Sequence, residues 1–121
     1  MKMLTVEIKK KLIARSQQKN QYGEPLPFKD TDPVICKFFN PVGIGDWYIM
    51  SGEEVPNYEN PEKTDWLFFG LCVLQYAELG SVTLHQLESV KLPFQSSIER
   101  DLYYDGTWAD LKEIMNTSAI H

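Results

Sequence analysis

The longest apolar run of the chain lies at its middle, at residues 66–74 (WLFFGLCVL). Nine residues are too few to cross a bilayer, and the aromatic side chains and Gly70 favour a strand over a helix. The run therefore predicts a central strand that is buried on both faces or nearly so. Gly70 in mid-strand predicts a bulge or the close approach of another backbone.

Other apolar segments between turn signals predict the rest of a sheet. We expect strands at about 34–39, 46–50, 78–82 and 98–104. The connection between the first two is too short for a parallel crossover, so this pair is expected to be antiparallel. The predicted fold class is α+β, with an antiparallel sheet of four to five strands and two or three helices packed mainly on one face.

The N-terminal segment predicts a basic amphipathic helix. Thr5 can cap it, and Ile8, Leu12 and Ile13 form a narrow apolar stripe in a helix that runs to about Gln18. Its basic residues are Lys9, Lys10, Lys11, Arg15 and Lys19. Two interpretations stay open: a packed helix with a solvated lysine face, or a contact for phosphates or an acidic partner.

Two later segments predict short helices. Thr83 and Gln86 have the spacing of a capping box, which marks a helix start. Thr107 is expected to cap the last helix, with Asp110 in its first turn. Residues 116–121 after it are expected to fray.

The formal net charge of −5 over 121 residues is unevenly distributed. Residues 1–19 sum to +5, so the remaining 102 residues sum to −10. Residues 46–65 hold six acids against Lys63 alone. Within them, 51–64 contains Gly, Pro and Asn and is expected to form a long acidic loop, which is either mobile or functional.

This acidic loop is the candidate partner-binding surface. Tyr58 lies inside it, and an aromatic side chain among carboxylates suits protein recognition better than nucleic-acid stacking. The candidate partner-binding residues are Asp46, Trp47, Glu53, Glu54, Tyr58, Glu59 and Glu62.

Composition argues against several classes of protein. No apolar window reaches the length of a membrane span, and the N-terminus lacks the apolar core and cleavage site of a signal peptide. Cys36 and Cys72 stand in apolar runs without metal-type spacing, which is typical of buried free thiols in a cytoplasmic protein. His85 and His121 are the only histidines, and no phosphate loop or nucleophile motif is found. We expect a cytoplasmic protein without metal or cofactor, and the oligomeric state stays open.

A polar set near the C-terminal end of the core has two interpretations. On a strand, Glu99 and Asp101 point to one face and Arg100 to the other. Arg100 between apolar neighbours needs a carboxylate, and Glu78 or Glu88 could supply it. A structural Arg–carboxylate network is favoured over binding or acid–base chemistry, because no histidine, lysine or metal partner is evident.

Several blocks of the sequence together resemble a known family. They are Asp32-Pro33-Val34 leading to Lys37-Phe38-Phe39-Asn40-Pro41, Trp47-Tyr48, Phe68-Phe69-Gly70-Leu71, Glu78-Leu79-Gly80, Leu84-x-x-Leu87-Glu88 and Ile98-Glu99-Arg100-Asp101-Leu102-Tyr103. Their order and spacing, over about 30–105, resemble the domain of unknown function family 2958, small bacterial proteins often carried on plasmids and integrative elements. The 51–64 segment is longer than the family pattern. The resemblance implies a cytoplasmic accessory role in the context of mobile DNA, and it transfers no catalytic residue.

The predicted organisation is a single domain over 1–121. It comprises the N-terminal basic helix (1–19), the family-like core (30–105) and a short C-terminal helix with a tail (106–121).

Three functional hypotheses follow. The first is a non-catalytic accessory protein that binds an unidentified protein through its acidic loop and counters host defence for a mobile element. In a sharper form, its carboxylates mimic phosphates in a basic groove of the partner. The second is weak nucleic-acid binding through the basic helix. The third is an enzyme that uses Glu99 and Asp101.

Overall fold

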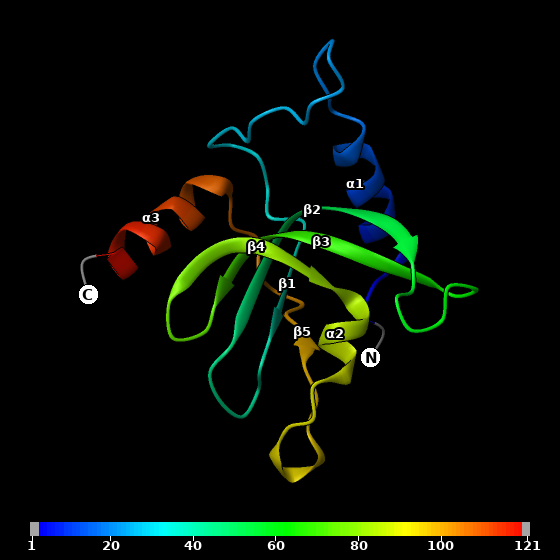
Figure 1. Cartoon of the computed structure of the whole chain (residues 1–121). Helices are drawn as coiled ribbons and strands as arrows, with labels where there is room; N and C mark the ends of the chain where they lie inside the picture. The colour runs from blue at the N-terminus through cyan, green and yellow to red at the C-terminus, as the bar shows by residue number, and fades with distance from the viewer. Residues whose placement is uncertain (1–2, 120–121) are drawn as a thin grey trace.

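The computed structural model describes residues 3–119 of the chain. The elements in chain order are α1 (Val6–Ser16), β1 (Cys36–Phe39), β2 (Asp46–Pro56), β3 (Thr64–Val73), β4 (Ala77–Thr83), α2 (Leu84–Ser89), the 3₁₀ turn η1 (Pro93–Gln95), β5 (Glu99–Arg100) and α3 (Trp108–Ala119) (Figure 1). The strands form one antiparallel sheet of five, and helices pack against it, so the predicted α+β class is confirmed.

The strand order of the sheet is β4-β3-β2-β1-β5. Strands β1 to β4 form a meander, and β5 returns to pair with the outer edge of β1. The β2–β3 register shifts between Ile49 and Ser51, next to Gly70, which lies opposite Ile49. A Cβ atom at Gly70 would collide with the carbonyl oxygen of Tyr48, so the close backbone approach predicted at this glycine is confirmed.

Each face of the sheet has its own apolar core. The core of the first face consists of Leu4, Ile8, Leu12, Cys36, Phe38, Ile49, Trp66, Phe68, Leu87 and Ile98. The core of the second face consists of Val34, Tyr48, Met50, Leu71 and Leu111. Helices α1 and α2 therefore cover one face, called here the α1 face, and α3 covers the other, called the α3 face.

The predicted helix starts agree with the structure. The Thr5 Oγ1 atom accepts a hydrogen bond from the Ile8 N–H at 3.1 Å, and Thr83 and Gln86 form the full capping box. Helix α3 runs to Ala119, so the fraying predicted from Asn116 is wrong for 116–119. Ile120 and His121, which belong to the same prediction, lie outside the described residues.

The predicted bounds are within two residues of the observed ones for β1, β3 and β4, and they differ more for β2 and β5. Strand β2 continues to Pro56 and does not end at 50, because its last residues pair with the start of β3. Strand β5 has only two residues, whereas a strand over 98–104 was predicted. The chain leaves the sheet there because the Asp101 carboxylate accepts a hydrogen bond from the Tyr103 N–H at 2.9 Å, which forms a local turn.

Residues 17–33, called here the strap, connect the end of α1 to the region where α3 begins (Figure 1). The strap holds no helix or strand, but it is anchored at several points. The Asp32 carbonyl accepts a hydrogen bond from the Trp108 N–H at 2.8 Å, and the Asp30 carboxylate lies 2.6 Å from Lys112 Nζ. The Phe28 ring packs against both Phe69 and Trp108, at centroid distances of 6.1 and 5.0 Å. Within the described residues, no helix combines the length and apolar character that a membrane crossing requires.

Candidate functional site

The acidic segment is the end of a β-hairpin, which corrects the prediction of a loop over 51–64. Glu53 and Glu54 lie on β2, opposite Leu67 and Trp66 of β3, and only 57–63 connect the two strands. Because side chains alternate along a strand, Glu53 and Glu54 point to opposite faces of the sheet. Asp65 is buried and accepts a hydrogen bond from the His85 N–H at 3.0 Å, so this acid belongs to the fold and not to the surface.

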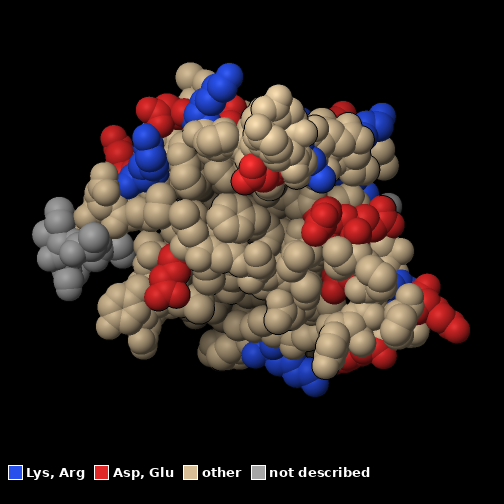
Figure 2. Space-filling view, turned by 45° about the horizontal axis from the view of Figure 1, so that its top comes forward, with Lys and Arg blue, Asp and Glu red and all other residues tan. Residues whose placement is uncertain are grey.

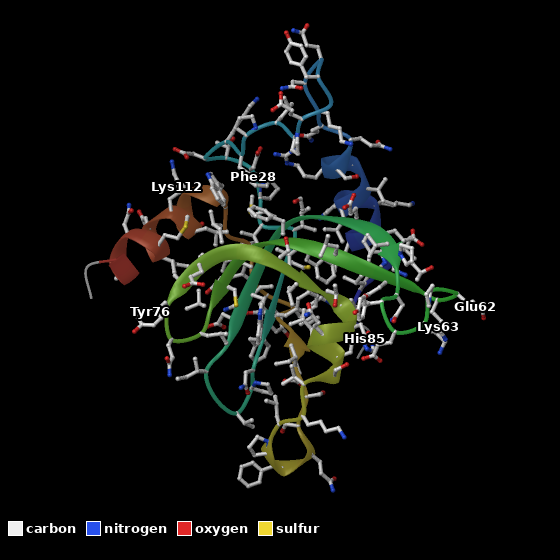
Figure 3. All side chains as sticks on the ribbon, viewed as in Figure 1. Phe28, Glu62, Lys63, Tyr76, His85 and Lys112 are labelled. Carbon is white, nitrogen blue, oxygen red and sulfur yellow. The ribbon has the colours of Figure 1, made fainter. Side chains whose placement is uncertain are left out.

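The connection between β2 and β3, called here the hairpin tip (57–63), is closed by its own hydrogen bonds. The Asn57 side-chain oxygen accepts from the N–H groups of Glu59 and Asn60, at 2.9 and 3.1 Å. Glu59 lies 3.3 Å from His85 Nε2 of α2, which connects the tip to that helix. Figure 3 shows Glu62 and Lys63 at the end of the projecting hairpin. The side chain of Tyr58 is 94% exposed at this tip.

Asp46 and Trp47 do not join this surface. They begin β2, whereas Glu53, Glu54 and the tip follow toward its other end, and a strand of this length spans on the order of 30 Å. Asp46 lies 3.6 Å from Lys37 Nζ, which also approaches Asp101 at 3.8 Å. Trp47 is half-buried and packs against the core of the α1 face. The predicted partner-binding set is therefore divided between two ends of the hairpin.

The strand order excludes one of the two predicted partners of Arg100. Arg100 lies on β5 and Glu78 lies on β4, which are opposite edges of the sheet, so these two cannot pair. Asp101 approaches Lys37, and Glu88, the other predicted partner, is exposed on α2. Arg100 lies opposite Phe38, whereas Glu99 lies opposite Phe39 and so points to the other face.

A compact polar site on the α3 face, called here the Lys37 cluster, contains Lys37, Asp46, Tyr48, Asp101 and Tyr104. The Lys37 ammonium group lies over the rings of Tyr48 and Tyr104, at 5.1 and 5.3 Å from their centroids. Burial, followed by the neighbouring Tyr48 and nearby carboxylates, raises the pKa of Tyr104 to about 12. The Tyr104 phenol therefore stays protonated at neutral pH. The contacts of Lys37 connect β1 to Tyr48 of β2 and to Tyr104.

The basic helix presents fewer cations than predicted. Lys9, Lys10 and Lys11 are exposed, but Arg15 is buried, and Ile13 takes an outward position with 41% of its surface exposed. The predicted stripe of Ile8, Leu12 and Ile13 is thus wrong in its last member. Figure 2 shows basic and acidic side chains interspersed around one face of the molecule, with neutral residues in its middle.

The two thiols are free, as predicted, but only Cys36 is buried, whereas Cys72 is half-buried. Cys36 is poorly suited to nucleophilic chemistry. Burial raises the pKa of the Cys36 thiol to about 12, although Arg100 opposes the shift. The pKa of Cys72 is also raised, by burial and by Glu78. A raised pKa suppresses the thiolate, which is the reactive form.

A groove that the sequence did not predict lies between the strap, the end of α1 and the α3 face of the sheet. Its volume is about 800 Å³, and its lining includes Arg15, Lys19, Phe28, Glu53, Leu67 and Phe69. We call it the Arg15 groove. The Arg15 side chain is mostly buried, donates a hydrogen bond from Nη2 to the Leu26 carbonyl at 2.5 Å, and lies 4.4 Å above the Phe28 ring. Helical periodicity could have signalled an inward Arg15, since it follows Ile8 and Leu12 on one side of the helix.

The sequence as a whole matches a known protein family. A family model described as "Protein of unknown function (DUF2958)" matches residues 3–116. The chain belongs to this family. No curated protein and no solved structure matched the chain.

A second feature of this DUF2958 chain was also absent from the sequence predictions. Phe94 and Gln95 adopt left-handed backbone conformations, with φ of 61° and 58°, and Phe94 is 90% exposed. Such conformations are unfavourable for non-glycine residues. No signal in the sequence marks this turn, because Pro93 restricts its own φ and not that of the residue after it.

Three observations describe the chemical groups available to the DUF2958 chain. Among the described residues, no group of three or more His, Cys, Asp or Glu side chains is arranged to hold a metal ion. Glu99 and Asp101, the carboxylates of the enzyme hypothesis, do not line the Arg15 groove. The exposed aromatic at the hairpin tip and the groove with its buried guanidinium are both features of recognition sites.

Proposed function

We propose that this DUF2958 protein is a non-catalytic interaction module that binds a protein partner through the hairpin tip. The observation that carries the proposal is Tyr58, whose side chain is 94% exposed on a connection closed by hydrogen bonds. An aromatic side chain held in this way can enter a partner's pocket at low entropic cost.

The charges around Tyr58 indicate the chemistry of the partner. Glu59 and Glu62 lie in the tip, Glu53 and Glu54 lie on the adjoining strand, and Lys63 is the one cation of this segment. A partner surface with an apolar pocket and a basic rim would complement this arrangement and be attracted at low salt. Host defence proteins are the first partners to test, because the family resemblance implies a role in mobile elements.

The phosphate-mimic form of the hypothesis has less support. A mimic needs carboxylates spaced along one face, but Glu53 and Glu54 point to opposite faces of the sheet. The binding energy is therefore assigned mainly to Tyr58, and the carboxylates are assigned to steering and specificity.

The test is capture of partners from nuclease-treated host lysate, followed by affinity measurement with the purified partner. Tyr58→Ala is expected to weaken binding about 30-fold, the effect of losing a 2 kcal/mol hot spot. Tyr103→Ala is the matched control, because Tyr103 is 91% exposed and lies outside the hairpin. Glu59→Gln with Glu62→Gln is expected to lower the association rate and its dependence on salt.

Two results would contradict the proposal. One is a partner that binds the Tyr58→Ala variant as tightly as the wild type. The other is recovery of nucleic acid that is lost at high salt and on changing Lys9, Lys10 and Lys11 to Glu, which would favour the basic helix as the binding surface.

A further inference from the structure

We propose that the Arg15 groove binds a small organic acid that carries a single carboxylate on an apolar body. This site is separate from the hairpin tip, and the inference does not depend on the proposed protein partner. The groove volume of about 800 Å³ lies within the range of small-molecule sites in proteins.

The first argument is the incomplete pairing of Arg15. The residue is 9% exposed, and its Nε atom is buried without a hydrogen-bond partner. Within the described part of the chain, Arg15 forms no ion pair. A buried guanidinium without a carboxylate is costly, and a carboxylate bound against the part of Arg15 that lines the groove would offset that cost.

The second argument is the charge of the lining, which favours a monoanion. Arg15 and Lys19 contribute two positive charges and Glu53 contributes one negative charge. A net charge of about +1 suits one carboxylate but stabilises a dianionic phosphate poorly.

The third argument is the apolar surface beside the guanidinium. Phe28, Leu67 and Phe69 line the groove and are only half-buried, so they retain surface that a ligand can cover. Figure 3 shows Phe28, a residue of the strap, between α1 and α3. Covering apolar surface provides affinity, while the guanidinium selects for the charged group.

A purely structural role for Arg15 makes a different prediction. Its hydrogen bond to Leu26 and its contact with the Phe28 ring fasten the strap to α1. If Arg15 only stabilises the fold, the protein is expected to bind an acid and its neutral amide equally. A preference for the acid therefore distinguishes a ligand-binding Arg15 from a purely structural one.

The experiment measures binding to the full chain by titration in ¹H–¹⁵N NMR spectra. The probes are 2-naphthoate and octanoate, each compared with its neutral amide, and inorganic phosphate. At least one acid is expected to bind about tenfold more tightly than its amide, the effect of one charge-assisted hydrogen bond. The shifted amide signals are expected to include those of Arg15, Phe28 and Leu67.

Three variants test the assignment. Arg15→Met is expected to abolish the preference for acid over amide. Lys10→Met is the matched control, because it removes the same charge from an exposed position of the same helix and is expected to leave the preference unchanged. Glu53→Gln is expected to strengthen binding of the acid about two- to fivefold, because it removes the one opposing charge of the lining.

The wild-type result alone can overturn the inference, so the test does not require a folded Arg15→Met variant. Equal affinities for both acids and their amides would contradict it, as would shifts confined to other surfaces or no binding by either acid. Phosphate that binds in the groove as tightly as the acids would contradict the assigned monoanion class.

Discussion

At the scale of single residues, the two paired glycines of β3 and β4 show why position decides the effect of a substitution. Gly70 and Gly80 are direct partners in the sheet. A Cβ atom at Gly70 would collide with the backbone of β2, whereas one at Gly80 would meet no atom within 4 Å. The sequence indicated a constraint at Gly70 because it interrupts an apolar strand.

We therefore predict opposite outcomes for the two alanine substitutions. Gly70→Ala is expected to lower the free energy of unfolding by more than about 3 kcal/mol, because backbone atoms of two paired strands must separate. Gly80→Ala is expected to change it by less than about 1 kcal/mol, since alanine reduces the entropy of the unfolded chain and fits the open edge. Urea denaturation of both variants checks this prediction, and a similar loss in both would refute the assigned cause.

At the scale of elements, α1 shows which inward residues the periodic pattern of a helix predicts correctly and which it does not. Capping by Thr5 and the burial of Ile8 and Leu12 were correctly predicted. Ile13 was assigned inward because it is apolar. The inward residue after Leu12 is Arg15, because its guanidinium contacts the Phe28 ring and the Leu26 carbonyl of the strap. That contact joins residues distant from the helix pattern, so the helix sequence alone does not specify it.

The same helix supplies a matched pair of substitutions. Leu12→Ala is expected to destabilise the fold by about 2–5 kcal/mol, because Leu12 is fully buried and its loss leaves a cavity over Gly52. Ile13→Ala is expected to cost less than about 1 kcal/mol, because its side chain is 41% exposed and alanine is the better helix former. Thermal and chemical unfolding distinguish the two variants. An equal loss of unfolding free energy in both would mean that Ile13 packs inward, as the predicted apolar stripe requires.

In the second half of β2, the local composition predicted a loop where the structure has a strand. The Gly, Pro and acidic residues of 51–56 are poor strand formers. They remain extended because they pair with β3 residue by residue, from Ser51 opposite Phe69 to Pro56 opposite Thr64. Cross-strand pairing of this kind is visible only when the partner strand is in place.

At the scale of the whole molecule, strand order decided which predicted site residues meet. An antiparallel sheet was predicted, and the pairing of its first two strands followed from their short connection, but the return of β5 to β1 follows a long irregular segment. That return places Arg100 and Glu78 on opposite edges, so the spacing of charges could not exclude this pair. The Arg15 groove likewise needs the strap, α1 and the sheet together.

The last prediction concerns what holds the strap across the molecule. Phe28 contacts Phe69 of β3, Trp108 of α3 and Arg15 of α1, so one ring joins three elements. Phe28→Ala is expected to destabilise the protein by about 2–4 kcal/mol, through lost apolar burial and lost aromatic contacts. Asp30→Ala removes the contact with Lys112, but both side chains are exposed, so the expected loss is below about 1 kcal/mol.

Limited proteolysis and hydrogen exchange show whether the loss is local. In the Phe28→Ala variant, amide exchange and cleavage are expected to increase first in residues 19–30, because these residues lose their central anchor. In the Asp30→Ala variant, the same residues are expected to stay protected, because the ring and the Trp108 hydrogen bond to Asp32 remain. A strap that loosens equally in both variants would mean that the ion pair between Asp30 and Lys112 contributes as much as the aromatic contact, which would contradict the prediction.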